Sequence, residues 1–271
     1  MTPEYAVTDS TPPDATAADA IPGRRPIVFW GPRNSGKTTY LGRMLLRAGE
    51  FDEAANWHVT PADERSADYA ADILEMLRRE GAVRPTLVTE RPFWFKLQHR
   101  RRVLGLAQTS EWDLVVLDPK GELFLRNRLR ETEDQAVLQL VARSHGLVLL
   151  VDPSCDNAAY TYWEMFADNI HEFVMAMRNG PERKRTLDAM NRIRVPTAVC
   201  LTKMDRHPGA GEPLAFLRTR LGAAYDLIHR SFTNYQVFPC SALGSESAAR
   251  PWGLLPPLKW LTEQQKKRFP L

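Results

Sequence analysis

A glycine-bracketed loop, "GPRNSGKT" from Gly31 to Thr38, fits the pattern G-x-x-x-x-G-K-[ST]. The glycines let backbone N–H groups wrap phosphate oxygens, and the N-terminus of a following helix favours negative charge. The ammonium group of Lys37 would reach the β- and γ-phosphates of a nucleotide, and the Thr38 hydroxyl would ligate Mg²⁺. We therefore expect a nucleotide site that includes Gly31, Arg33, Asn34, Ser35, Gly36, Lys37, Thr38 and Thr39.

A second set of polar residues follows two apolar runs. Asp118 ends "WDLVVLD" and opens "DPKGE", where its carboxylate could hold Mg²⁺ and the Gly121 N–H could meet the γ-phosphate. Asp152 ends "GLVLLVD" and is a rival for the metal acid. We prefer Asp118, because Gly121 follows it at a useful spacing, and expect Asp152 to cap the loop that it begins.

The segment "LTKMD", from Leu201 to Asp205, predicts which base is bound. The Asp205 carboxylate can accept hydrogen bonds from N1 and N2 of guanine, whereas adenine offers no such pair of donors. The aliphatic stem of Lys203 can pack over the base plane. In "CSAL", Ser241 and Ala242 could present a backbone N–H to guanine O6. Selection of GTP over ATP is therefore expected from Thr202, Lys203, Asp205, Ser241 and Ala242.

The elements that position these residues alternate along the chain. Apolar strand-like runs, among them "PIVFW", "WDLVVLD", "GLVLLV" and "PTAVCL", alternate with helix-like segments such as "PLAFLRTRLGAAYDLIHRSF" from Arg25 to the C-terminus. This pattern predicts an α/β fold of three layers, with a mostly parallel central sheet and helices on both faces. Ligands of such folds bind at the carboxyl ends of the strands, where the polar motifs fall.

The segment between the first predicted helix and the strand "RPFWFKLQ" has its own pattern. "NWHVTPADERSADYAADILEMLRREG" predicts a short strand and then a helix with Tyr69, Ile73 and Leu77 on one face. Phe93 and Leu97 belong to a half-exposed strand by their alternation, and "RRVLGLAQ" is a candidate hairpin partner for it.

Composition excludes several classes of function. The chain has 271 residues, 44% of them hydrophobic and 25% charged, as in globular proteins. Its net charge of +3 is too small to indicate a nucleic-acid binder. The 3 cysteines have no paired spacing, which favours a reduced, cytoplasmic setting. The longest apolar run is too short for a membrane span, and we find no lipid-anchor motif.

Together, "GPRNSGKT", "DPKG", "TKMD" and "SAL" resemble the motifs of the Ras-like, translation-factor-related class of P-loop GTPases. The resemblance runs from Arg25 to the C-terminal helix. It implies a P-loop NTPase fold, Mg²⁺-dependent binding and hydrolysis of GTP to GDP, two switch loops, and protein effectors or regulators. The spacing is also similar to poorly characterised bacterial GTPases, some of which belong to multi-protein effector or conflict systems. We expect a disordered leader over residues 1–23 and one GTPase domain over 24–271, with an insert around 51–85.

The sequence departs from this class at functional positions. Thr202 stands where the class has Asn, which would reduce guanine affinity. Glu122 stands where the class has a water-positioning Gln, and its charge would be repelled by the γ-phosphate. We therefore expect slow intrinsic hydrolysis. Arg33 faces the γ-phosphate position, where it would block a partner's arginine finger, point to solvent or act as a charge donor in cis.

The resemblance also implies a switch threonine that meets both Mg²⁺ and the γ-phosphate. Thr60, Thr86 and Thr89 are candidates, and Thr86 is favoured by its place before the Phe93 strand. The expected metal ligands are thus Thr38, Asp118 and Thr86, and the expected catalytic residues are Lys37, Thr86, Gly121 and Glu122.

Three functions are compatible with these residues. The leading one is a GTP-dependent molecular switch. The second is a catalytically weak pseudo-GTPase that serves as a nucleotide-binding structural subunit, which Glu122 and Thr202 favour. The third is an ATP-dependent P-loop enzyme, against which the T-K-x-D motif argues.

Overall fold

The computed structural model describes residues 26–31, 35–47, 56–80, 92–103, 106–116, 140–153, 171, 174–175, 177–179, 183–244 and 250–268. The predicted leader, 1–23, lies outside these residues. Within them, one seven-stranded sheet has the order β2-β3-β4-β1-β5-β6-β7. Its strands are β1 (Ile27–Trp30), β2 (Trp57–Pro61), β3 (Phe93–Val103), β4 (Leu106–Val116), β5 (Gly146–Val151), β6 (Thr197–Leu201) and β7 (Tyr235–Pro239).

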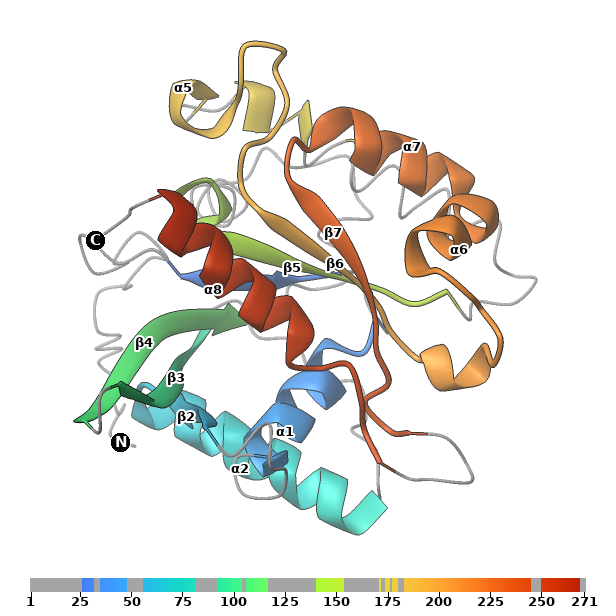
Figure 1. Cartoon of the computed structure of the whole chain (residues 1–271). Coiled ribbons are helices and arrows are strands. Elements are labelled where there is room, and N and C mark those ends of the chain that lie inside the picture. The colour runs from blue at the N-terminus through green and yellow to red at the C-terminus, as the bar shows by residue number, and fades with distance from the viewer. Residues whose placement is uncertain are drawn as a thin grey trace, which may run out of the picture.

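The sheet is parallel from β4 to β7 and antiparallel at its other edge. β1 pairs in parallel with β4 and β5, and β6 pairs in parallel with β5 and β7. β2 and β3 form an antiparallel pair, as do β3 and β4. The predicted α/β class with a mostly parallel central sheet is therefore confirmed (Figure 1).

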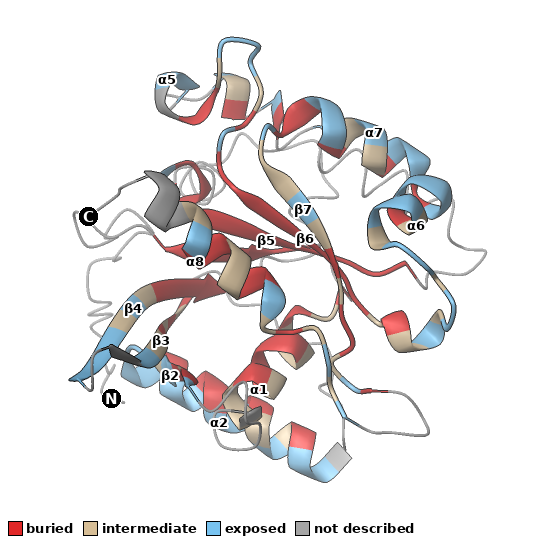
Figure 2. Ribbon diagram, viewed as in Figure 1, coloured by how far each residue is buried: buried red, intermediate tan, exposed pale blue. Residues whose placement is uncertain are grey.

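Helices cover both faces of the sheet. Residues of α1, α2 and α8 share one buried apolar cluster with Ile27 and Phe29, whereas residues of α6 and α7 share another with Val28 and Trp30. Neighbouring residues of β1 therefore belong to different core layers, one on each face of the sheet. Figure 2 shows that β5 and β6 are buried between these layers. The helices are α1 (Lys37–Arg47), α2 (Glu64–Glu80), α5 (Arg183–Thr186), the 3₁₀ helix η2 (Met204–Arg206), α6 (Pro213–Arg220), α7 (Gly222–Ser231) and α8 (Pro256–Arg268).

The predicted insert around 51–85 contains β2 and α2. β2 adds an edge strand to β3, with Val59 opposite Leu97. Tyr69, Ile73 and Leu77 of α2 are all buried, as their spacing predicts. A side chain at Gly42 of α1 would lie 2.4 Å from Ile73 Cγ2 and 2.5 Å from Leu77 Cδ1, so α1 and α2 approach closely there.

Two predicted boundaries are wrong. The expected hairpin partner and the expected strand "WDLVVLD" are parts of one strand, β4, which pairs with β3 from Val103–Leu106 to Phe93–Val116. The helical segment before β7 is divided at Leu221, whose φ of −132° and ψ of 46° interrupt the helix. Of the described helices, none is long and apolar enough to cross a membrane.

Candidate nucleotide-binding site

The carboxyl ends of four parallel strands bring the predicted motifs together. β1 is followed by Gly31, β5 by Asp152, β6 by Thr202 and β7 by Cys240. Because these strands are neighbours in the order β1-β5-β6-β7, the loops that follow them lie at one edge of the sheet. This edge is where ligands bind in such sheets.

The phosphate-loop residues that the structure describes are held at both ends of the loop. A Cβ atom at Gly31 would lie 2.7 Å from the Leu150 carbonyl oxygen and 2.7 Å from Ser35 Oγ, so no side chain fits there. Gly36 has a φ of 89°, a conformation that favours glycine. Lys37 is only 5% exposed, and its Nζ donates a hydrogen bond of 2.7 Å to the Gly31 carbonyl. The lysine side chain thus spans the loop that would enclose the phosphates.

Thr202 joins this loop to the predicted base-reading segment. Its Oγ1 lies 2.9 Å from the Ser35 carbonyl oxygen and 3.1 Å from the Val151 carbonyl oxygen. Its backbone N–H donates to the same Val151 carbonyl at 2.8 Å. The sequence predicted a residue near the base, and the structure adds that its buried hydroxyl bridges two loops.

Asp205 and Ser241, which follow the neighbouring strands β6 and β7, lie together. Ser241 Oγ donates to Asp205 Oδ1 at 2.5 Å, and the Gly244 N–H donates to Ser241 Oγ at 2.9 Å. Within the described part of the chain, Asp205 Oδ2 has no hydrogen-bond partner. The half-buried carboxylate is therefore oriented through one oxygen and can accept a ligand donor with the other.

The sequence predicted that Ser241 and Ala242 could present a backbone N–H to guanine O6, and the structure distinguishes between the two residues. The Ser241 N–H donates to the Trp252 carbonyl at 3.0 Å, and the Trp252 N–H donates back at 2.9 Å. Ala242 follows in a bend, and its N–H donates no hydrogen bond to a described residue. Ala242 is therefore the residue that can offer a backbone donor to a base.

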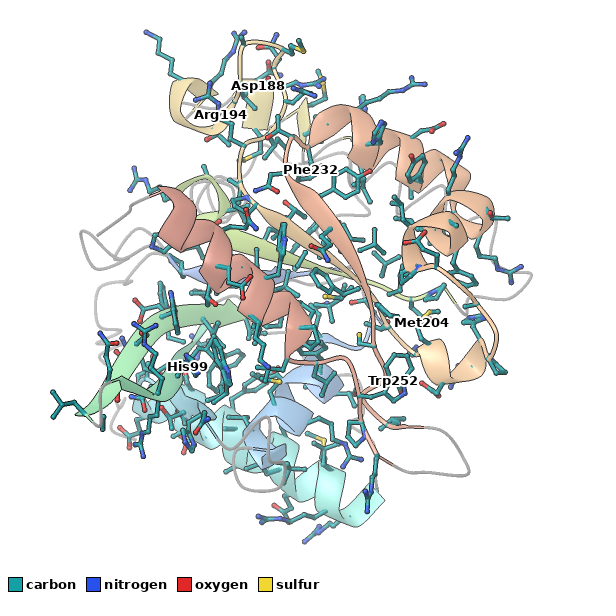
Figure 3. All side chains as sticks on the ribbon, viewed as in Figure 1. His99, Asp188, Arg194, Met204, Phe232 and Trp252 are labelled. Carbon is teal, nitrogen blue, oxygen red and sulfur yellow. The ribbon has the colours of Figure 1, made fainter. Side chains whose placement is uncertain are left out.

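Sequence reasoning missed the segment of Trp252, a residue labelled in Figure 3, which forms an isolated antiparallel bridge with Ser241. The signal that could have found it is the turn dipeptide Trp252-Gly253. Gly253 has a φ of 72°, and a Cβ there would lie 2.2 Å from the Pro239 carbonyl oxygen. Only glycine lets this segment pack against the end of β7.

Lys203 forms an ion pair that the sequence did not predict. Its Nζ lies 2.5 Å from Asp152 Oδ2, and the Asp152 side chain is 4% exposed. Lys203 has a φ of 54°, in the left-handed region. Asp152 was assigned to capping its loop, and the ion pair with Lys203 was missed.

Several predicted residues lie outside the described residues: Arg33, Asn34, Thr86, Thr89, Asp118, Gly121 and Glu122. Thr38 and Thr39 lie in the first turn of α1, and Thr60 is exposed on β2. Among described residues, no group of three or more His, Cys, Asp or Glu side chains could hold a metal ion. Of the predicted metal ligands, the structure thus describes Thr38 alone.

Comparisons with known proteins give no family and a limited structural likeness. No protein-family model matches the sequence, and no curated protein does. The chain is similar to the structure described as the signal recognition particle receptor SRb-GTP/SRX complex from Chaetomium thermophilum, with 11% identity, a TM-score of 0.48, and coverage of 89% of this chain and 98% of that chain. It is also similar to nucleolar GTP-binding protein 1 from Plasmodium falciparum, with 10% identity, a TM-score of 0.43, and coverage of 90% and 88%. A third similar structure is the GTP-bound GTPase-like domain of S. cerevisiae Ski7, with 17% identity, a TM-score of 0.43, and coverage of 89% of this chain and 50% of that chain. The site assignment rests on the chain's own residues.

Proposed function

We propose that this protein binds GTP and GDP with Mg²⁺, hydrolyses GTP slowly, and acts as a molecular switch toward protein partners in the cytoplasm. It would then be a Ras-like, translation-factor-related P-loop GTPase. One observation carries the proposal: hydrogen bonds connect the phosphate loop through Thr202 to the end of β6, and Asp205 is oriented by Ser241. The spacing of the motifs and their meeting at one sheet edge therefore support a single nucleotide site.

The described residues fit the nucleotide in their chemistry. The loop closed by the Lys37–Gly31 bond has glycine where a side chain would collide, which suits close backbone approach to phosphates. The Asp205 carboxylate and the Ala242 N–H match the donors and the acceptor of the guanine edge. Thr38, with Asp118 and Thr86, would hold Mg²⁺, which when bound neutralises charge on the phosphates.

Base selection is tested with Asp205→Asn. We expect GTP affinity to fall roughly tenfold or more, because the carboxylate that accepts from N1 and N2 is lost, and affinity for xanthosine triphosphate to rise. Equilibrium binding of GTP, ATP and xanthosine triphosphate measures both effects. Asp226→Asn, an exposed change on α7, is the matched control and should leave all three affinities unchanged. Equal affinity of the wild type for ATP and GTP would favour the ATP-dependent enzyme.

The rate of hydrolysis separates the switch from the pseudo-GTPase. We expect slow but measurable phosphate release under saturating GTP in single-turnover assays. No release, with or without candidate protein partners, would indicate a nucleotide-binding structural subunit. Fast release that Glu122→Ala abolishes would instead make Glu122 a general base.

A further inference from the structure

Asp152, the buried acid after β5, has a role that the proposed function does not assign. We propose that Asp152 is a positioning residue, which fixes the Lys203 side chain at the base-binding end of the site, and that it is not the acid that holds Mg²⁺. The proposal rests on the proposed function, because Lys203 is the residue whose stem would cover the base.

The two side chains come from neighbouring strand ends. β5 and β6 pair in parallel up to Val151 and Leu201, so Asp152 and Lys203 follow adjacent strands. Lys203 Nζ reaches Asp152 Oδ2 at 2.5 Å, while the lysine side chain stays 32% exposed and the aspartate side chain 4% exposed. The ammonium is therefore paired with a buried carboxylate, while about a third of the lysine side chain stays exposed.

The backbone around Lys203 is fixed on both sides. The Thr202 N–H donates to the Val151 carbonyl at 2.8 Å, and the Met204 N–H donates to the Cys240 carbonyl at 3.1 Å. These bonds support the left-handed conformation of Lys203, which few residues other than glycine adopt. A fixed backbone and a fixed ammonium define the path of the methylene groups between them.

A Lys203 side chain that is already restrained by Asp152 should bind a purine base more tightly than one that rotates freely. A free lysine side chain must lose rotamer freedom when it packs on a ligand, whereas the Asp152 contact has already restricted it. The same contact disfavours a metal role, because the ammonium of Lys203 neutralises the carboxylate that a dication would need. The geometry therefore places Asp152 with the base-binding residues.

The experiment measures binding of a fluorescent GDP to Asp152→Asn. We expect the Kd to rise about five- to tenfold, with no change in the Kd of inorganic tripolyphosphate measured by competition. The ratio of GDP affinities with Mg²⁺ and with EDTA should match that of the wild type. Asp226→Asn again controls for loss of one negative charge, because this side chain is exposed on α7.

A double-mutant cycle tests whether Asp152 acts through Lys203. Asp152→Asn combined with Lys203→Ala should bind GDP no more weakly than Lys203→Ala alone. Because Lys203→Ala leaves a buried carboxylate without its ammonium, urea unfolding of each variant checks that the chain is folded.

Three results would overturn the assignment. GDP affinity could be unchanged in Asp152→Asn, tripolyphosphate binding could fall as much as GDP binding, or the losses of affinity in the cycle could be additive. If Asp152→Asn abolished the difference between the GDP affinities measured with Mg²⁺ and with EDTA, Asp152 would be the carboxylate that holds Mg²⁺. If the wild type binds no guanine nucleotide, the proposed function fails first, and the role of Asp152 fails with it.

Discussion

At the scale of single residues, the Thr202 hydroxyl is the link between the phosphate loop and the base-reading loop. Thr202→Val keeps the shape of the side chain and removes the donor, which leaves the Ser35 carbonyl without this bond. We expect the free energy of unfolding to fall by about 1 to 3 kcal/mol, because a buried polar group loses a partner. Nucleotide affinity should fall as well, since the two loops are no longer joined. Urea unfolding and GDP binding measure the two effects.

Thr202→Ser is the matched control for that change. Serine keeps the hydroxyl and removes only a methyl group, so it should retain most of the GDP affinity. Equal GDP affinities of the serine and valine variants would show that the hydroxyl bridge has no part in binding.

At the scale of elements, α2 is packed as part of the core although it belongs to the predicted insert. Ile73 is 0% exposed and meets α1 at Gly42. We expect Ile73→Ala to lower the free energy of unfolding by about 2 to 5 kcal/mol, as large-to-small changes in a packed core do. Asp72→Ala, one residue earlier on the exposed side of the same helix, should change it by no more than about 0.5 kcal/mol. Urea unfolding measures both changes. Equally small losses in the free energy of unfolding of the two variants would mean that α2 is not part of the core.

The sequence predicted elements well where a local pattern sufficed. The strands β1, β5 and β6 were predicted from their apolar runs, and the buried face of α2 from the spacing of residues such as Ile73. Each of these patterns is contained in a short stretch of the chain. The ion pair between Asp152 and Lys203 and the bridge between Ser241 and Trp252 were missed. These contacts depend on which strands are adjacent and on how a loop returns, and no spacing rule encodes that information. The divided helix at Leu221 was missed for the same reason, because continuous helix-forming composition does not show where tertiary packing interrupts a helix.

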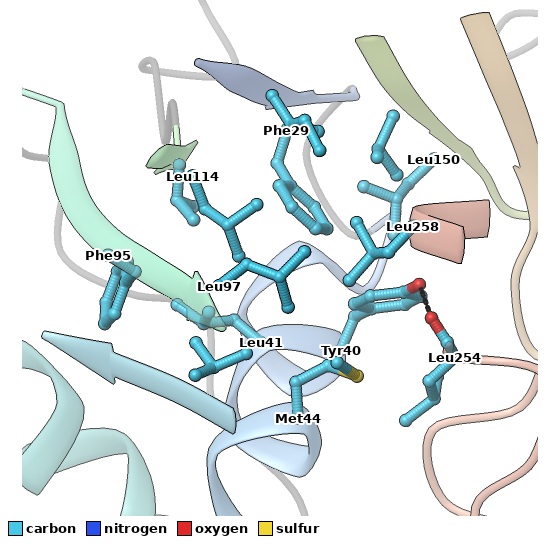
Figure 4. Packing of buried hydrophobic residues seen from close by; sticks show 14 of the residues in the cluster. Phe29, Tyr40, Leu41, Met44, Phe95, Leu97, Leu114, Leu150, Leu254 and Leu258 are labelled. Atoms are coloured by element: carbon cyan, nitrogen blue, oxygen red, sulfur yellow. Dashed lines mark hydrogen bonds between the residues drawn. The ribbon is translucent and has the colours of Figure 1, made fainter. Parts of the chain in front are cut away.

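At the scale of the whole molecule, three ionisable groups are buried in the layer between the sheet and helices α1 and α8. They are Tyr40, Cys200 and Cys240, each no more than 1% exposed. Figure 4 shows Tyr40 in this layer, with its hydroxyl donating to the Leu254 carbonyl. Burial raises the pKa of Tyr40, and the nearby Cys200 and Cys240 raise it further. Burial is also the main cause of the raised pKa of each thiol, with Cys240 adding to the shift of Cys200 and Asp205 to that of Cys240.

These raised pKa values predict a loss of stability at alkaline pH. The ordinary pKa is 10.0 for Tyr40 and 9.0 for the thiols, so the unfolded chain releases these protons first. The contribution of these three groups to the free energy of unfolding is fully present below these ordinary pKa values. It is lost as the pH rises above them toward the raised pKa values of the folded state. Each proton that only the folded state retains lowers the free energy of unfolding by about 1.4 kcal/mol per pH unit, so the free energy should begin to fall above pH 9.0 and fall more steeply above pH 10.0. Urea unfolding with a reducing agent, at steps from about pH 8 to about pH 11, measures this slope. Cys200→Ala should reduce it by about one third, and an unchanged slope in that variant would show that the buried thiol does not contribute.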